Sequence, residues 1–245
     1  MLRVAARAGL LPFRYLAGIT NRELFHLNVG GSTFVYEFSG NDNIGEMLYW
    51  FGGDSFEPAA VAEFVRYLSK ARTVLDIGAN TGVYTLLALA GNPACRVVSW
   101  EPYSGNYQKL RRNVLLNGFD GRAELRCEAA SSQSGSVFLR PHENWTMHSV
   151  ADTSMAGTAI SATTVDSVIA DGEPVDLIKI DVEEFEYEVL CGSLRVLRES
   201  RPVLVLEIQP HCATKERTLA LLREIGYSVR SIDAQANWLA LPHSR

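Results

Sequence analysis

A glycine-rich run behind a short apolar segment is the first group of residues in the chain that could do chemistry. The run, Asp-Ile-Gly-Ala-Asn-Thr-Gly, spans 76–82 and lies between the apolar stretch 73–77 and a helical pattern that starts at Val83. Glycines in such a strand-to-helix turn let a ligand approach bare backbone closely. Val83 breaks the G-x-G-x-x-G spacing, and the sequence has no G-x-x-x-x-G-K-[ST] run. The turn therefore indicates a cofactor that is neither a dinucleotide nor held by a P-loop.

Two further signals follow the next two apolar strands. Glu101 ends the second strand, 25 residues after Asp76, where a carboxylate can accept hydrogen bonds from both ribose hydroxyls. Residues 128–130 (Glu-Ala-Ala) follow the third strand, where the chain could form a wall against an adenine ring. These three signals describe a nucleoside without a pyrophosphate. S-adenosylmethionine fits best, because its sulfonium and amino groups favour an acidic pocket.

Carboxylates also end the later strands. Asp181 ends the fourth strand, with Glu183 two residues on, and Glu207 lies near the end of the fifth. Neighbouring strands should bring Asp181 and Glu207 together. There they could act as a general base with a pKa raised by burial, or as oxygen ligands for magnesium. The competing interpretation is that Asp181 caps the helix that follows and Glu183 is an acid of its first turn. We expect Glu183 to contact the acceptor.

Histidines and aromatic residues supply the remaining candidates. His142 and His148 lie in the loop after the third strand, and either could be the base because imidazole titrates near neutral pH. A solvated loop histidine is the competing interpretation for each. Flat rings can stack on sugars, so Tyr49, Trp50 and Trp145 are candidate acceptor contacts, as is the carboxylate of Asp42. Alternatively, Tyr49 and Trp50 pack the N-terminal segment onto the core.

Alternating strands and helices must position these residues. Apolar strands separated by amphipathic helices indicate a parallel sheet covered on both faces, with ligands at the carboxyl ends of the strands. The last two strands are joined by a few residues and must pair antiparallel. We expect an α/β fold with a doubly wound, Rossmann-like, seven-stranded sheet that ends in this antiparallel hairpin. The expected strands are 73–77, 96–100, 123–127, 175–181, 203–208, 227–232 and 238–241; the expected helices are 58–70, 83–90, 104–117, 165–170, 184–191 and 215–225.

We predict two parts, an N-terminal β-containing arm over 1–57 and a domain over 58–245. Within that domain, residues 131–162 should form a polar loop with one hairpin at 136–140. The arm could contact the acceptor, a second subunit as a homodimer, or a membrane surface through an amphipathic helix. No run approaches the roughly 18 apolar residues of a transmembrane helix.

Charge and cysteine usage restrict the partners. The chain has 245 residues and a net charge of −5, which argues against nucleic acid and leaves small molecules and glycans open. Its four cysteines are widely spaced, which disfavours a disulfide scaffold or zinc ribbon and favours the cytoplasm.

Five motifs between about residues 57 and 210 belong together: VLDIGANTGVYT (74–85), WEP (100–102), NYQKLRRNVLLNG (106–118), DLIKIDVEEFEYEVLCGS (176–193) and LVLEIQP (204–210). In these residues the chain resembles the FkbM family of class I S-adenosylmethionine-dependent methyltransferases. Glu184 stands where the family usually has glycine, which could alter the turn beside the active site. The resemblance implies O-methylation, notably of sugars in polysaccharides, glycolipids and macrolides. The cofactor contacts that we expect are Asp76, Gly78, Ala79, Asn80, Thr81, Gly82, Tyr84, Thr85, Glu101, Pro102, Tyr103, Asn106, Glu128, Ala129, Ala130 and Asp181.

Two other functions compete with a sugar O-methyltransferase. A methyltransferase for a protein or nucleic-acid nitrogen is disfavoured. Enzymes of this fold that methylate amines often carry [DNS]-P-P-[YF] after the fourth strand, whereas residues 181–184 read Asp-Val-Glu-Glu, without proline. A non-sugar acceptor, in a protein or a small molecule, remains an alternative. A non-catalytic interaction module would tolerate loss of the acids at the strand ends, and those acids are present.

Overall fold

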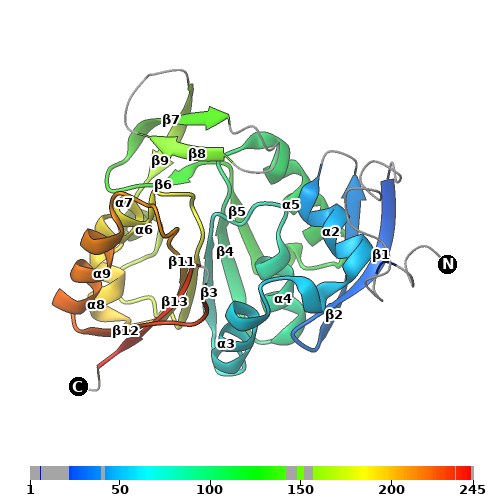
Figure 1. The fold of residues 1–245 in the computed structure, drawn as a ribbon, viewed down its shortest axis with the longest axis horizontal. Helices are drawn as coiled ribbons and strands as arrows, with labels where there is room; N and C mark the ends of the chain where they lie inside the picture. Colours follow the sequence, from blue (N-terminus) through cyan, green and yellow to red (C-terminus); the bar gives the residue numbers. More distant parts are fainter. Residues whose placement is uncertain are drawn as a thin grey trace.

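The described residues form a central mixed sheet of seven strands. The computed structural model describes residue 6 and residues 22–39, 42–141, 148–151, 157–234 and 236–243. The strand order is β12-β13-β11-β10-β3-β4-β5 (Figure 1). In chain order the strands are β3 (Thr73–Ile77), β4 (Arg96–Trp100), β5 (Ala123–Arg126), β10 (Leu177–Ile180), β11 (Val203–Glu207), β12 (Tyr227–Ser231) and β13 (Asn237–Pro242). Strands β5, β4, β3, β10 and β11 run parallel, and β13 is antiparallel to both β11 and β12. The predicted doubly wound sheet with a final antiparallel hairpin is confirmed.

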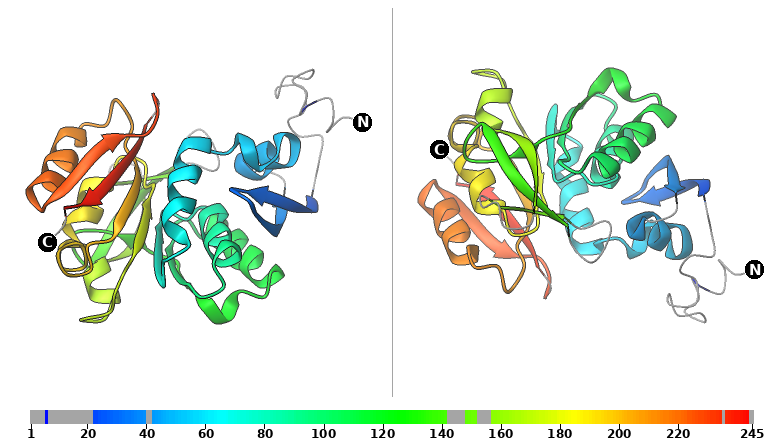
Figure 2. Two further views of the ribbon diagram at one scale, coloured as in Figure 1. Left: turned by 90° about the horizontal axis from the view of Figure 1, so that it is seen from below. Right: turned by 90° about the horizontal axis from the view of Figure 1, so that it is seen from above.

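Helices cover both faces of this sheet because successive strand residues point to opposite sides. In β10, Leu177 faces one apolar core, whereas Ile178 faces the other. The first core is closed by α3 (Pro58–Leu68), α4 (Val83–Gly91) and α5 (Ser104–Leu116). The second is closed by α6 (Val165–Val168), α7 (Glu186–Cys191), α8 (Leu194–Glu199) and α9 (Lys215–Glu224), and Figure 2 shows the two helical layers on either side of the sheet.

The described part of the N-terminal segment packs on the outside of the first helical layer (Figure 2). It consists of the hairpin β1 (Arg22–Val29) and β2 (Ser32–Ser39), then α2 (Asn43–Phe51) and the 3-10 turn η2 (Gly53–Ser55). The hydroxyls of Tyr36 and Thr81 lie 2.5 Å apart, and Asn113 Oδ1 accepts a bond from the Glu37 backbone N–H. These contacts tie β2 to the glycine-rich turn and to α5. The boundary near residue 57 stays a prediction.

A second sheet occupies the region expected to be a polar loop with one hairpin. The described residues there form four strands in the order β6 (Ala129–Ala130), β9 (Thr158–Thr163), β7 (Gly135–Pro141) and β8 (His148–Ala151). The expectation of a loop was wrong because Ser and Thr occupy the exposed face of these strands. Val137, Leu139 and Ala162 form the inner face and pack with Ala129 and Phe185.

Three helices differ from expectation, among them α8, for which no helix was expected. α2 carries the aromatic run 49–51, for which no helix was expected. α7 begins at Glu186 rather than at 184, because Glu183 and Glu184 adopt left-handed φ values of 50° and 75°. No helix among the described residues has both the length and the apolar composition needed to cross a bilayer.

Candidate functional site

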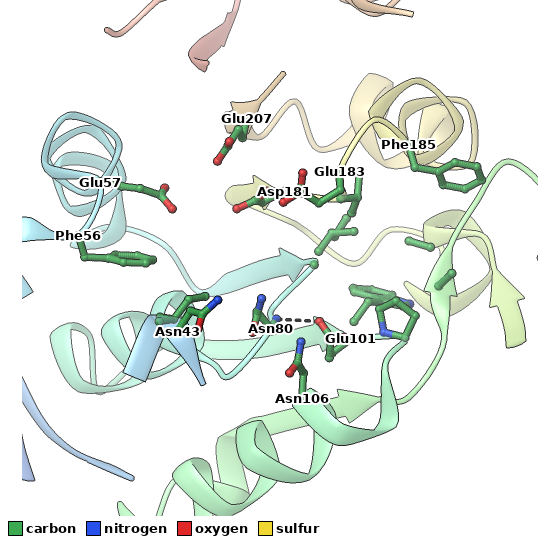
Figure 3. A pocket seen from close by; sticks show the side chains of 18 of the residues that line it. Asn43, Phe56, Glu57, Asn80, Glu101, Asn106, Asp181, Glu183, Phe185 and Glu207 are labelled. Carbon is green, nitrogen blue, oxygen red and sulfur yellow. Dashed lines mark hydrogen bonds between the residues drawn. The ribbon is translucent and has the colours of Figure 1, made fainter. Parts of the chain in front are cut away.

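A cavity of about 470 Å³ opens at the carboxyl ends of β3, β4, β10 and β11 (Figure 3). The described residues around it include five carboxylates and no basic side chain. Its lining consists of Asn43, Ile44, Met47, Ser55, Phe56, Glu57, Pro58, Ile77, Gly78, Asn80, Trp100, Glu101, Pro102, Asn106, Ala129, Ala130, Asp181, Val182, Glu183, Phe185 and Glu207. Such a lining favours a ligand that carries positive charge.

The glycine-rich turn forms the floor of the cavity. The backbone N–H groups of Gly78 and Ala79 both donate to the Trp100 carbonyl at 2.9 Å, which fixes the turn to the end of β4. Behind the turn, buried Asp76 accepts a hydrogen bond from the Thr85 hydroxyl at 2.5 Å. Burial raises the pKa of Asp76 to about 6. Asp76 therefore holds the turn in place from behind.

Glu101 presents a buried carboxylate at the end of β4. Its two oxygens accept from the backbone N–H groups of Asn80 and Tyr103, each at 2.8 Å. Burial raises the pKa of Glu101 to about 7, and these two hydrogen bonds partly oppose that rise. Each oxygen keeps a lone pair for a further donor. Glu101 and the buried Asn106 lie together in this half of the cavity (Figure 3).

The other half of the cavity holds a carboxylate cluster, which consists of Glu57, Asp181 and Glu207. These side chains come from the residue before α3 and from the ends of β10 and β11, and one oxygen of each lies within 4.8 Å of the others. Figure 3 shows them converging on one space. Burial, and then the charge of Asp181, raise the pKa of Glu207 to about 8.

A buried lysine lies against this cluster. The Nζ atom of Lys179 is 3.5 Å from an oxygen of Asp181 and 3.6 Å from an oxygen of Glu57, and the side chain is only 1% exposed. The same Glu57 oxygen accepts a hydrogen bond of 2.9 Å from the Tyr84 hydroxyl. Two carboxylates of the cluster thus share one ammonium group.

The turn between β10 and α7 departs from regular geometry at the position where glycine was expected from the resemblance. Glu183 and Glu184 are both left-handed, which costs a residue with a Cβ more than it costs glycine. The Glu184 N–H donates to Glu186 Oε1 at 3.1 Å, and the Glu184 carboxylate lies 3.3 Å from His211 Nε2. Glu183 lines the cavity, where burial and then Asp181 raise its pKa to about 7.

The structure separates the expected cofactor contacts into three groups. Eight line the cavity: Gly78, Asn80, Glu101, Pro102, Asn106, Ala129, Ala130 and Asp181. Four lie around a smaller hollow behind the turn: Asp76, Ala79, Thr81 and Tyr84. The other four, Gly82, Thr85, Tyr103 and Glu128, line neither space. Glu128 instead pairs with Arg126 and accepts from the Thr163 hydroxyl.

The expected acceptor and base residues are spread more widely. Tyr49 packs edge-on against Phe25 and Trp50, so these rings hold the N-terminal segment together. Asp42 caps α2 by accepting from the Gly45 N–H, and it lies outside the cavity lining.

Two expected residues, His142 and Trp145, lie outside the described residues. His148 lies on β8 opposite Pro141.

Sequence reasoning missed several side chains of the site, above all Glu57, Lys179 and Phe56. Lys179 had a signal, because a lysine between Ile178 and Ile180 in a buried strand must find a counter-charge. Glu57 and Phe56 had no such signal, since both come from a short connection before α3.

The chain is similar in sequence to known methyltransferases. The family model described as "Methyltransferase FkbM domain" matches residues 76–229. Methyltransferase sdnD of Sordaria araneosa is 26% identical over 190 residues, which are 64% of this chain and 73% of that protein.

Solved methyltransferase structures align with the chain at lower identity. The alignment with methyltransferase FkbM from Methylobacillus flagellatus covers 82% of this chain and 55% of that one, at 19% identity and a TM-score of 0.49. The O-methyltransferase TomG from Streptomyces achromogenes, in complex with SAM, gives 15% identity and a TM-score of 0.51 over 78% of this chain and 81% of its own.

Proposed function

Because the chain belongs to the FkbM family of methyltransferases, we propose that it transfers the methyl group of S-adenosylmethionine to a hydroxyl group. The acceptor hydroxyl in this proposal lies on a sugar of a polysaccharide, a glycolipid or a glycosylated natural product. The observation that carries the proposal is one cavity with Glu101 at one end and the carboxylate cluster at the other. The first end suits a nucleoside, and the second suits a hydroxyl that must lose a proton.

The residues around Glu101 fit the cofactor. The free lone pairs of Glu101 would accept from the ribose hydroxyls, while Ala129 and Ala130 would form the wall beside the adenine. When bound, S-adenosylmethionine supplies an electrophilic methyl group on a positively charged sulfur. The acidic lining favours that charge, which supports the fit. TomG binds SAM within the same fold.

Glu207 is the base in this proposal. An alcohol is a poor nucleophile at neutral pH, so a group with a pKa near the working pH must take its proton as the bond to carbon forms. Asp181 and Glu57 are paired with Lys179, whereas Glu207 has a pKa of about 8 and an oxygen 2.5 Å from Gln209 Nε2. Asp181 then raises the basicity of Glu207 and orients the acceptor. His148 and His142 remain alternative bases, as first predicted.

The acceptor would lie between the carboxylate cluster and the N-terminal segment. Phe56, Met47 and Ile44 give this side of the cavity an apolar wall, and Asn43 adds an amide. An apolar wall beside hydrogen-bonding groups matches a sugar, which has apolar faces and a rim of hydroxyls. Phe56 therefore takes the stacking role that the sequence suggested for Tyr49 and Trp50. A stacking role for Trp145 stays a prediction.

Calorimetric titration of S-adenosylhomocysteine into the purified protein tests the cofactor assignment first. Micromolar binding is expected, and its absence at millimolar ligand would overturn the assignment.

Free sugars, glycolipids and glycosylated small molecules are then screened as acceptors by release of S-adenosylhomocysteine. Asp181→Asn and Glu207→Gln should keep cofactor binding and lose turnover, and unchanged turnover in Glu207→Gln would remove it as the base.

Magnesium is left out of this proposal, because Lys179 already supplies a positive charge to the carboxylate cluster. A homodimer, a membrane-surface contact by the N-terminal segment and a cytoplasmic location stay predictions.

A further inference from the structure

The three carboxylates of the cluster lie close enough together to bind one ion, so their negative charge needs a compensating cation. Glu57, Asp181 and Glu207 each offer an oxygen, and these oxygens lie within 4.8 Å of one another. Hard divalent cations such as magnesium bind in oxygen-rich groups of this kind. The described surroundings of the cluster, however, already contain a cation.

Lys179 reaches the cluster from the interior of the sheet. It lies two residues before Asp181, and side chains at this spacing share one face of a strand. Its Nζ atom is 3.5 Å from Asp181 Oδ2, 3.6 Å from Glu57 Oε2 and 5.0 Å from the centre of the Tyr84 ring. Glu207 and Asp76 add attraction from the neighbouring strands. Groups on β10, β11, β3, α4 and the start of α3 therefore all face this ammonium.

A buried ammonium survives only where such partners compensate its lost hydration. At 1% exposure Lys179 cannot turn to solvent, so its charge stays with the cluster. A divalent ion would need the same oxygens at roughly 2.0–2.6 Å. It would then lie within a few ångströms of the ammonium and be repelled by it. The residues present do not fit a divalent cation.

We propose that Lys179 is the resident cation of the carboxylate cluster, a positioning residue that takes the place of a metal ion. It pairs with Glu57 and Asp181 and fixes the direction of their carboxylates, and it leaves Glu207 to receive a proton. The inference deepens the proposed function by making methyl transfer independent of divalent metal. It also places Glu57, which lies before the residues that the family model matches, inside the site.

Titration with Mn²⁺ tests the proposed role of Lys179 and needs no acceptor substrate. A result against that role would therefore leave the methyltransferase assignment untouched. Mn²⁺ is titrated into the wild-type protein and into Lys179→Met, and the bound ion is followed by electron paramagnetic resonance. The wild-type protein should bind no Mn²⁺ at this cluster below millimolar concentration. Lys179→Met, neutral and similar in length, should bind at least tenfold more tightly.

Matched variants identify the site of any binding. Lys179→Met/Glu57→Gln should lose the gained affinity, whereas Lys179→Met/Glu63→Gln, which changes a glutamate of α3 that pairs with Arg230 and not with the cluster, should keep it. Wild-type binding that Glu57→Gln abolishes would overturn the proposal, as would a folded Lys179→Met that binds no Mn²⁺. If Lys179→Met fails to fold, Lys179→Gln replaces it, and the wild-type titration decides the matter if neither folds.

Discussion

The backbone oxygen of Asp181 lies so close to Gly78 that a Cβ at position 78 would overlap it. Gly78 also has a φ of 86°, which disfavours any residue with a side chain. The glycine-rich turn after β3 and the acid at the end of β10 are therefore in direct contact. This contact sets the distance between the cofactor half of the cavity and the carboxylate cluster.

Gly78→Ala should destabilise the protein by several kcal/mol, because it adds a clash with backbone to left-handed strain. Gly118→Ala is the matched control. Gly118 has a φ of 66°, but nothing lies within 4 Å of a Cβ there, so we expect a loss of about 1 kcal/mol. Urea unfolding of the two variants measures the difference. Equal losses of stability in the two variants would show that the clash with the Asp181 backbone does not contribute to the destabilisation.

Glu101→Gln should weaken binding of S-adenosylhomocysteine by about 10- to 100-fold. A carboxylate accepts from both Asn80 N–H and Tyr103 N–H, whereas the amide would turn an NH₂ group toward one of them. Hydrogen bonds to a charged group contribute about 1.5–3 kcal/mol each. Calorimetry gives the affinity, with Glu124→Gln as the control because Glu124 is exposed on β5. Equal affinity in Glu101→Gln and the wild-type protein would contradict the ribose assignment.

The rate of methyl transfer should rise with pH and level off above about 8, where Glu207 loses its proton. Asp181 raises the pKa of Glu207, so Asp181→Asn should move the midpoint of whatever activity remains to lower pH. The pH profile of kcat, measured with S-adenosylmethionine and the acceptor found by the screen, checks this. A midpoint near 6.5 that Asp181→Asn leaves in place would indicate a histidine base instead.

Stability should change with pH for the same reason. Folding raises the pKa of Glu207 from 4.5 to about 8, so the folded protein holds this proton more tightly than the unfolded chain. The resulting stabilisation is complete below pH 4.5 and is lost as the pH rises through about 8. Glu207→Gln cannot ionise, so it should match the wild-type protein at pH 4.

At pH 9 Glu207→Gln should be more stable than the wild-type protein by about 1–2 kcal/mol, a value reduced by solvent screening of a half-buried group. Denaturant unfolding at the two pH values gives the comparison. A difference that stays constant with pH would rule out a raised pKa at Glu207.

Glu184→Gly should stabilise the protein by about 1 kcal/mol, because it relieves a left-handed φ of 75°. The change also removes the contact with His211, which is exposed and therefore contributes little. Glu184→Ala separates the two effects, since it removes the contact and keeps the strain, and it should stay within about 0.5 kcal/mol of the wild-type protein. Thermal unfolding ranks the three proteins. A gain in Glu184→Ala as large as that in Glu184→Gly would mean that the backbone is not strained.

Much of the fold could be predicted from local patterns. The apolar runs 73–77, 96–100 and 203–207 are buried strands, and the turn that starts at Asp76 lies where ligands of this fold bind. Burial on both faces demands a continuous apolar run, so these strands were easy to recognise. The second sheet was missed because its strands bury one face only and expose serine and threonine on the other.

The sequence by itself determined the succession of the seven central strands along the chain, the turn at 76–82 and the acids at the ends of individual strands. Only the tertiary structure decided that Glu57, Lys179, Asp181 and Glu207 share one space, because they come from three elements that sheet pairing and helix packing bring together. Their chemistry depends on this proximity. A carboxylate acquires a raised pKa, and an ammonium a permanent charge, from neighbours distant in the chain, which no local pattern of residues can encode.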